Sequence, residues 1–142
     1  MRITELIQRR LLYAAVLASA LLAGCSSGES NKEESIRIIE EIGAMESSDS
    51  RDPNHSNLPF DAYEFEAETL DQVRVEVISD GFTPLLKLVE VSSGAVLAEW
   101  DSEYSADDAL NYVIAGPGNY EARIYSREDG RGDYKLIITV TP

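Results

Sequence analysis

Residues 60–77 have the sequence FDAYEFEAETLDQVRVEV, and this stretch decides the fold. Apolar residues alternate with glutamates from Tyr63 to Glu68, and valines alternate with charged residues from Val73 to Val77. Successive side chains of a strand point to opposite faces of a sheet. Strict alternation of this kind, with β-branched and aromatic residues, therefore predicts two half-buried strands.

Five further apolar runs follow this stretch at roughly ten-residue spacing. Turn signals that contain glycine separate them. About seven short strands arranged in this way predict an all-β domain, built as an antiparallel β-sandwich. The five runs are Leu85–Val91, Ala95–Trp100, Leu110–Ala115, Asn119–Ser126 and Asp133–Thr141.

The inward-facing apolar residues of these strands are expected to form the core. Cys25 is the only cysteine, so the fold has no intramolecular disulfide and depends on apolar burial. The expected core residues are Tyr63, Phe65, Val73, Val75, Val77, Phe82, Leu86, Leu88, Leu97, Tyr112, Ile114, Tyr120, Ala122, Ile124, Tyr134, Leu136, Ile138 and Val140.

The N-terminus has the layout of a secretory signal peptide. Basic residues precede the mostly apolar residues 11–23, and small residues stand directly before Cys25. The apolar run is shorter than the roughly 20 residues that a membrane-spanning helix needs. We therefore predict that residues 1–24 are a signal peptide and that the remainder is exported.

The end of this leader resembles the lipobox of bacterial lipoproteins, in the residues Leu22, Ala23, Gly24 and Cys25. The resemblance implies that cleavage occurs before Cys25 and that Cys25 carries a covalent diacylglycerol and a further acyl chain. Two or more acyl chains hold a protein stably on a membrane. We thus expect a lipid-anchored protein of the cell envelope, and Ser26 at the next position resembles the pattern of outer-membrane sorting.

Residues 25–59 are expected to be a lipidated tether before a domain over residues 60–142. Its flanking parts are small and polar, which is typical of flexible segments. Between them, apolar residues from Ile38 to Met45 recur at spacings of three and four, which favours a short amphipathic helix over residues 31–46. The apolar stripe of this helix has three candidate contacts: the domain, a partner or the membrane surface.

The chain is strongly acidic, with a formal net charge of −14. Nucleic-acid binding relies on cationic groups that neutralise phosphates, so we expect neither a nucleic acid nor an anionic lipid surface as a partner. Cationic partners and divalent cations stay open, beside the simpler role of acidity in keeping the protein soluble.

Four carboxylates lie close together in the predicted loop after residue 100. Calcium takes six to eight oxygen ligands and favours clustered carboxylates, although the spacing here is not that of an EF-hand. The sequence therefore offers a candidate calcium site, and its alternative is a solvated acidic loop. The four residues are Asp101, Glu103, Asp107 and Asp108.

Trp100 is a candidate ligand-binding residue, as a stacking platform for a sugar or a peptide, and the alternative is a tryptophan that closes the sandwich edge. Catalytic groups are scarce. His55, the only histidine, stands in a polar linker, whereas nucleophilic catalysis needs a positioned base and zinc sites normally need histidine or cysteine. We therefore predict that the protein is not an enzyme and requires no cofactor, with a hydrolase as the less favoured alternative.

Five ordered segments of the domain carry a family resemblance. They resemble the patterns D-x-Y-x-F, F-D-P-x-L-x-L, G-x-x-L-A-x-x-D, P-x-G-x-Y-x-x-R-V and G-x-Y-x-L, at Asp61–Phe65, Phe82–Leu88, Gly94–Asp101, Pro117–Ile124 and Gly132–Leu136. The set resembles the bacterial pre-peptidase C-terminal domain family, except that Thr83 stands where an aspartate is usual and the loop at Pro117–Gly118 is short.

This resemblance implies a jelly-roll-like sandwich of a kind that accompanies exported enzymes, in roles of secretion, folding or adhesion. Some relatives bind calcium. The expected function is therefore a membrane-anchored, non-catalytic module that binds a protein or polymer or assists an exported partner. The alternative is a calcium-stabilised structural component of the envelope.

Overall fold

A computed structural model describes residues 35–54 and 56–142. The described residues all belong to one compact unit, Glu33–Pro142. Within them, nine strands carry the fold, and one 3₁₀ turn, η3, joins the last two. The elements are β1 (Arg37–Met45), β2 (Ser50–Asp52), β3 (Leu58–Ala67), β4 (Gln72–Ser79), β5 (Pro84–Glu90), β6 (Val96–Asp101), β7 (Leu110–Val113), β8 (Gly118–Ser126), η3 (Arg127–Asp129) and β9 (Gly132–Thr141).

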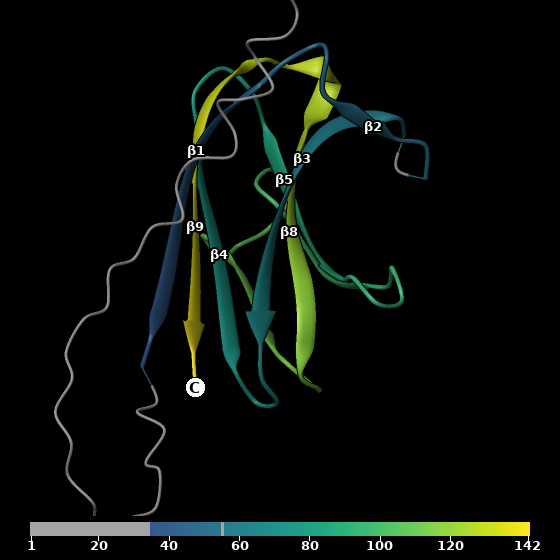
Figure 1. The fold of residues 1–142 in the computed structure, drawn as a ribbon. Coiled ribbons are helices and arrows are strands. Elements are labelled where there is room, and N and C mark those ends of the chain that lie inside the picture. Colours follow the sequence, from purple (N-terminus) through teal and green to yellow (C-terminus); the bar gives the residue numbers. More distant parts are fainter. Residues whose placement is uncertain (1–34, 55) are drawn as a thin grey trace, which may run out of the picture. The chain divides into compact units, whose positions relative to one another are not determined.

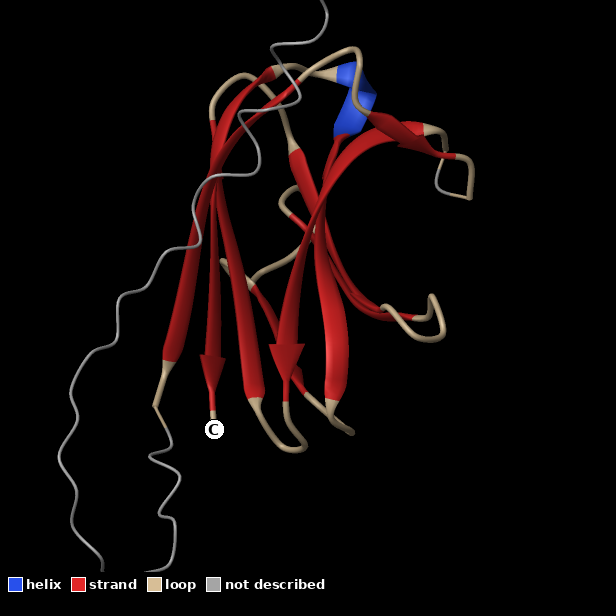
Figure 2. Ribbon diagram, in the orientation of Figure 1, coloured by secondary structure: helices blue, strands red, loops and turns tan. Residues whose placement is uncertain are grey.

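Two antiparallel sheets face each other across one core (Figure 1). The four-stranded sheet has the order β1-β9-β4-β7, and the five-stranded sheet has the order β2-β3-β8-β5-β6. Strands and their connections account for nearly all of the described residues (Figure 2). The prediction of an all-β antiparallel sandwich is confirmed. No element of the described residues is a helix of the length and apolarity needed to cross a membrane.

The core lies between the sheets and follows the alternation of the sequence. Every residue that we expected in the core is buried there or packs against it. On β3, for example, Phe65 points inward, while its neighbours Glu64 and Glu66 are exposed. The buried core also contains four residues that are not among those expected there: Met45, Ala67, Trp100 and Leu110.

The predicted helix over residues 31–46 is wrong for its described part, because residues 37–45 form strand β1. This strand pairs with β9 along its whole length, from Arg37 opposite Val140 to Met45 opposite Gly132. This pairing supplies hydrogen-bond partners to one edge of β9, whose other edge pairs with β4. Tertiary pairing of this kind overrides a local helical pattern.

The sandwich also begins earlier than the predicted boundary at residue 60. Strand β1 contributes Met45 and Ile39 to the core, and β2 pairs with the start of β3. Residues 37–59 therefore belong to the domain rather than to a tether. The tether expected over residues 25–34 and the signal peptide over 1–24 lie outside the described residues.

Candidate functional site

The residues predicted for lipidation are not among those that the structure describes. Leu22, Ala23, Gly24 and Cys25 precede residue 35, so the lipobox stays a prediction from sequence. His55 also falls outside the described residues. The other candidates, Trp100 and the four carboxylates, can be placed.

The acidic loop between β6 and β7 does not gather its carboxylates around one point. The side chain of Arg127 donates to Asp101 and lies 3.2 Å from Glu103 Oε2. Asp108 instead accepts from Arg74 Nη2 at 2.9 Å, and this hydrogen bond lowers the pKa of Asp108 below its ordinary value. The two arginines stand on different elements, η3 and β4, so they draw the carboxylates apart.

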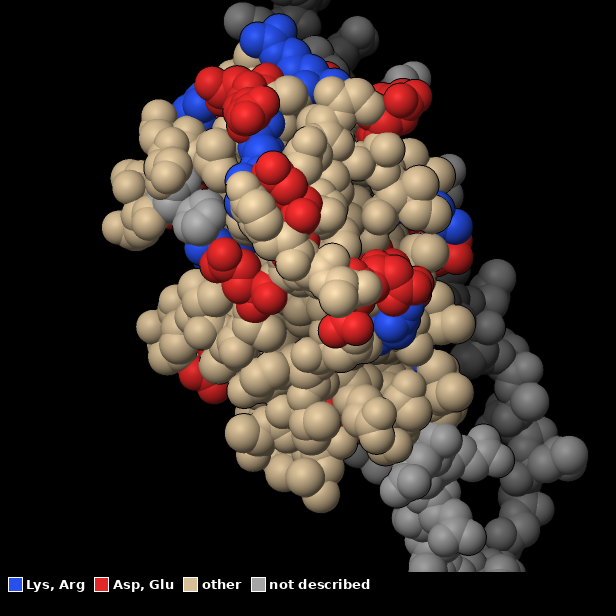
Figure 3. All heavy atoms as spheres, turned by 180° about the vertical axis from the view of Figure 1, so that it is seen from behind, with Lys and Arg blue, Asp and Glu red and all other residues tan. Residues whose placement is uncertain are grey.

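Asp107 is held through its backbone, because its carbonyl oxygen accepts a hydrogen bond from Trp100 Nε1. Within residues 35–54 and 56–142, no group of three or more His, Cys, Asp or Glu side chains is placed to hold a metal ion. Elsewhere too, basic side chains adjoin acidic ones, as on the side shown in Figure 3. The structure does not bring the four predicted calcium ligands together.

Trp100 is a core residue and not a stacking platform. It is 8% exposed and lies in the buried cluster between the sheets. Its Nε1 donates to the carbonyl oxygen of Asp107 at 2.8 Å, which satisfies the one polar group of the indole. The prediction that Trp100 binds a ligand is wrong, because inward burial leaves no ring face to offer.

A hollow on the outer surface of the four-stranded sheet bears on the enzyme alternative. It is lined by polar and apolar side chains that include Gln72, Asn111 and Thr139, and its lining contains no carboxylate. Glycoside hydrolysis by paired carboxylates needs two such groups across a substrate site. The hollow therefore does not supply that chemistry.

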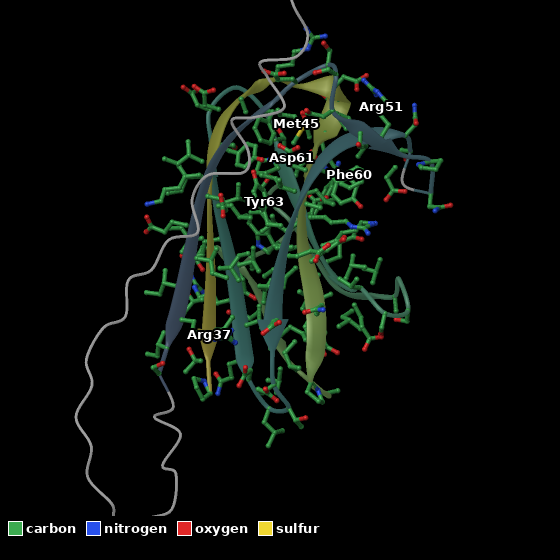
Figure 4. The ribbon with its side chains drawn as sticks, viewed as in Figure 1. Arg37, Met45, Arg51, Phe60, Asp61 and Tyr63 are labelled. Atoms are coloured by element: carbon green, nitrogen blue, oxygen red, sulfur yellow. The ribbon has the colours of Figure 1, made fainter. Side chains whose placement is uncertain are left out.

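A different surface has the organisation of a binding site: the outer side of the five-stranded sheet. We call it the aromatic face and define it by Phe60, Lys87, Arg123 and Tyr125. Strand register creates it, because Phe60 on β3 stands opposite Tyr125 on β8. On the other flank of β8, Lys87 of β5 stands opposite Arg123. Figure 4 shows Phe60 on the opposite side of β3 from Tyr63, which faces the core.

The side chains of the aromatic face contact one another closely. The rings of Phe60 and Tyr125 are stacked, with centroids 5.3 Å apart. Arg123 lies over the ring of Phe60, and Lys87 lies over the ring of Tyr125, at 5.4 Å and 5.3 Å from the centroids. Each cation thus interacts favourably with the negative face of an aromatic ring.

Curvature of the sheet encloses the centre of this face. In Figure 1, β2 and the turn after β5 both project to the side away from the four-stranded sheet. Asp52 on β2 consequently reaches across β3 and accepts a hydrogen bond of 2.8 Å from the hydroxyl of Tyr125 on β8. Tyr125 is fully buried, and Lys87 is only 7% exposed, although both lie on an outer sheet surface.

Burial and pairing set the protonation states here. Burial raises the pKa of Tyr125 to about 12, and the hydrogen bond to Asp52 contributes in the same direction. Burial also acts to raise the pKa of Asp52. The hydrogen bonds from Tyr125 and from the Asn54 N–H, with the charges of Lys87 and Arg123, outweigh it and leave the pKa below its ordinary value. Asp52 is therefore an ionised acceptor at neutral pH.

The margin of the aromatic face is acidic. Arg123 Nε pairs with Glu121 at 2.7 Å, and Lys87 Nζ pairs with Glu99 at 3.4 Å. The carboxylate of Glu99 is 47% exposed, and Glu64 on β3 is exposed as well. Because the central side chains already hold one another in place, contact with a partner would order few further groups. The surface is suited to recognition, above all of a basic partner.

One sequence pattern indicates that the five-stranded sheet is covered on both sides here. The run Leu85–Val89 is apolar on both faces of its strand except at Lys87, and such runs are typical of strands that are covered on both sides. Leu85 and Val89 are indeed buried at 2% and 1% exposure outside the main core. Phe60 and Tyr125 likewise occupy outward positions, where alternation would lead one to expect polar residues.

Comparisons with known proteins show the fold. No protein-family model matches the chain, and no curated protein matches it. Among solved structures, the chain is similar to Aeromonas hydrophila PliG, a periplasmic lysozyme inhibitor of g-type lysozyme, with 9% identity over 78% of this chain and 90% of that one, at a TM-score of 0.52.

A second similar structure is the pre-peptidase C-terminal domain of collagenase from Bacillus anthracis, the family that the ordered motifs resemble. It has 18% identity over 70% of this chain and 87% of that domain, at a TM-score of 0.49. Salmonella Typhimurium PliG has 18% identity over 80% and 95% of the two chains, at a TM-score of 0.43. At such identities, the likeness to Aeromonas PliG is one of fold.

Proposed function

We propose that this chain is a lipoprotein of the bacterial envelope whose sandwich is a non-catalytic binding module. The module recognises a protein or polymer, or assists an exported partner, through the aromatic face. The observation that carries the proposal is the buried, mutually paired cluster of Phe60, Lys87, Arg123 and Tyr125 on an outer sheet surface. Most outer surfaces of antiparallel sheets are simply solvated.

The composition of this face favours protein recognition. Phe60 and Arg123 are the partly exposed members of the cluster, and the buried Tyr125 and Lys87 hold them in place. Arginine is enriched among the residues that dominate binding energy at interfaces. A pre-ordered cluster also avoids part of the entropy cost of binding. The exposed carboxylates at its margin, such as Glu64 and Glu99, favour a partner with a basic surface.

The proposed location follows from the leader. The lipobox resemblance at Leu22–Cys25 implies a lipid anchor on Cys25, and Ser26 supports sorting to the outer membrane. Aeromonas PliG, which shares the fold, is a periplasmic lysozyme inhibitor. Its example supports a protein-binding role for this fold in the envelope, and makes g-type lysozyme a defined ligand to test.

The binding proposal is tested by photo-crosslinking in living cells. A photoreactive amino acid is placed at Ala62, which is exposed on the aromatic face beside Arg123, and at Val113, which is exposed on the other sheet. We expect a discrete adduct from position 62 and none from position 113. Glu64→Lys, which reverses a marginal charge, is expected to reduce the adduct. Equal adducts from both positions would overturn the proposal, as would no adduct from position 62.

The anchor is tested separately. Mass spectrometry of the mature protein is expected to find an N-terminus at Cys25 with diacylglycerol and acyl chains attached. Cys25→Ser is expected to release the protein from the membrane fraction. Protease treatment of intact and permeabilised cells then distinguishes a surface location from a periplasmic one. An unmodified Cys25 would contradict the lipoprotein assignment and leave the crosslinking result unaffected.

A further inference from the structure

The outer surface of the four-stranded sheet carries strongly exposed isoleucines beside its polar and charged residues. We call it the isoleucine face and define it by Ile36, Ile38, Ile42 and Ile78, which are 60%, 63%, 83% and 65% exposed. In the register of the sheet, Ile42 of β1 and Ile78 of β4 both stand opposite Lys135 of β9. Ile38 and Ile42 of β1 and Ile78 of β4 therefore lie on one surface of the sheet, with Lys135 between Ile42 and Ile78, and Ile36 directly precedes β1.

Four charged groups on this face form ion pairs, and Asp133 of β9 is exposed on it as well. Lys135 Nζ pairs with Glu40 Oε2 at 3.0 Å, and Arg74 Nη2 pairs with Glu76 Oε1 at 3.0 Å. The isoleucine face thus combines exposed apolar side chains with ion pairs whose carboxylates are partly exposed, such as Glu40 at 56%. Such a surface is compatible with the interfacial region of a bilayer, where apolar side chains insert beside polar headgroups.

The expected lipid anchor on Cys25 favours the bilayer, rather than a second copy of the chain, as the surface that covers the isoleucine face. Nine residues, 26–34, connect Cys25 to Ser35, and Ile36 follows directly. From Cys25 to Ser35 the chain reaches at most about 35 Å when fully extended. A lipid on Cys25 therefore keeps the isoleucines of β1 permanently close to the bilayer, and a tether of this kind converts a weak contact into one with high effective concentration.

A second copy of the chain fits the face less well. Pairing of two β1 edges would bring together two Glu41 residues, which point inward on this edge strand opposite the buried Leu136. Inward-pointing charges on edge strands oppose edge-to-edge association. Packing of two whole faces would bring two strongly acidic chains into contact, with a net charge of −14 each before processing.

We propose that the isoleucine face docks the sandwich on the lipid bilayer that holds its anchor. This inference rests on the proposed lipidation of Cys25. Because the two sheets lie back to back, docking through the four-stranded sheet would turn the aromatic face away from the membrane. The binding surface would then be accessible to a partner outside the lipid.

The test uses the lipidated full chain in vesicles of phosphatidylcholine. Cys25 is the only cysteine and is consumed by lipid, so a single introduced cysteine can carry a fluorescent label. The label is placed at Ile42→Cys on the isoleucine face, or at Glu64→Cys on the five-stranded sheet as the matched exposed control. Nitroxide-labelled lipids are expected to quench the label at position 42 several-fold more than the label at position 64.

A second variant tests whether the isoleucines cause the contact. With the label at Ile78→Cys, the double substitution Ile38→Glu and Ile42→Glu is expected to abolish the quenching, although exposed positions tolerate such changes without unfolding. Equal quenching at positions 42 and 64 in lipidated protein would overturn the docking alone. Fluorescence energy transfer between labels at position 42 of two protein molecules, without quenching by lipid, would also overturn the docking and would identify a second copy as the occupant. Absence of lipid on Cys25 by mass spectrometry would overturn the anchor and the docking together.

Discussion

The hydroxyl oxygens of Tyr63 and Tyr134 lie 2.6 Å apart and join the two sheets through the core. Tyr63 comes from β3 of the five-stranded sheet and Tyr134 from β9 of the four-stranded sheet. The hydroxyl of Tyr134 donates to Asp61 Oδ2 at 2.5 Å, so the proton between the two tyrosines belongs to Tyr63. Burial raises the pKa of Tyr134, and the hydrogen bond to Asp61 adds to this effect. Tyr134 thus keeps its proton in the bridge at physiological pH.

Tyr134→Phe is expected to destabilise the sandwich by about 1–3 kcal/mol, because it deprives Asp61 of a donor and Tyr63 of an acceptor. Tyr63→Phe is expected to cost less, since Tyr134 then still donates to Asp61. Urea unfolding of both variants measures the two free energies. Equal stability of Tyr134→Phe and the unaltered protein would contradict this account of the bridge.

Gly43→Ala is expected to cost about 1–3 kcal/mol through overpacking. A Cβ at position 43 would lie 2.5 Å from Cζ and from the hydroxyl oxygen of Tyr134, inside the contact distance of any real Cβ. Gly116→Ala is the control, since a Cβ there meets nothing within 4 Å. Removal of the hydroxyl in Tyr134→Phe should reduce the cost of Gly43→Ala, and a double-mutant cycle measures that coupling.

Stability is expected to fall as the pH rises from about 10 to 12. The folded state raises the pKa of Tyr125 to about 12, so it holds this proton at a pH where the unfolded chain has lost it. Since the unfolded state then binds fewer protons, the free energy of unfolding decreases with pH, by about 2 kcal/mol at pH 12 from this group. Urea unfolding across this range measures the slope, and Tyr125→Phe should flatten it. An unchanged slope in the variant would contradict the assignment.

Calcium is expected to leave the melting temperature unchanged. Occupancy at 100 times the dissociation constant would stabilise a protein by about 2.7 kcal/mol, which corresponds to several degrees in a domain of this size. Arg127 and Arg74 engage three of the four predicted ligands, so we expect no such shift. Melting in chelator and in millimolar calcium, at matched ionic strength, is the measurement. A rise of several degrees would favour the calcium-stabilised alternative.

Residues 35–142 are expected to fold as an isolated fragment, whereas residues 60–142 are not. The shorter fragment loses Met45 from the core and leaves β9 without its partner β1. It also loses the acceptor of the Tyr125 hydroxyl, because Asp52 is absent. Circular dichroism and cooperative thermal unfolding distinguish the two outcomes. A cooperative transition in the shorter fragment would restore the domain boundary suggested by the sequence.

Alternation in the sequence was sufficient to predict the strands after Phe60 and their inward residues. In a strand that is buried on one face, apolar and polar residues alternate along the chain. Alternation failed at residues 37–45. There Ile39 and Met45 face the core, while Ile38 and Ile42 face outward, so both faces carry apolar side chains and the pattern imitates a helix. The β-branched character of three isoleucines was the remaining clue.

The candidate sites were harder to predict because their partners are distant in sequence. The carboxylates of Asp101 and Asp108 are neighbours in the chain, yet they pair with arginines that β4 and η3 bring from elsewhere. The aromatic face likewise depends on the register of β3, β8 and β5 and on the curvature that brings Asp52 to Tyr125. Neither register nor curvature is determined by local sequence.

Attachment of the proposed tether at β1 has a mechanical consequence. With the sandwich lifted off the bilayer and the tether taut in line with β1, a pull on the lipid anchor would enter the domain along this strand, from its start at Arg37. The register with β9 runs unbroken from Arg37 to Met45, so all of these backbone pairs would bear the load together in shear instead of opening one at a time. The pairing of β1 with β9 would then set the force that the domain withstands before it unfolds.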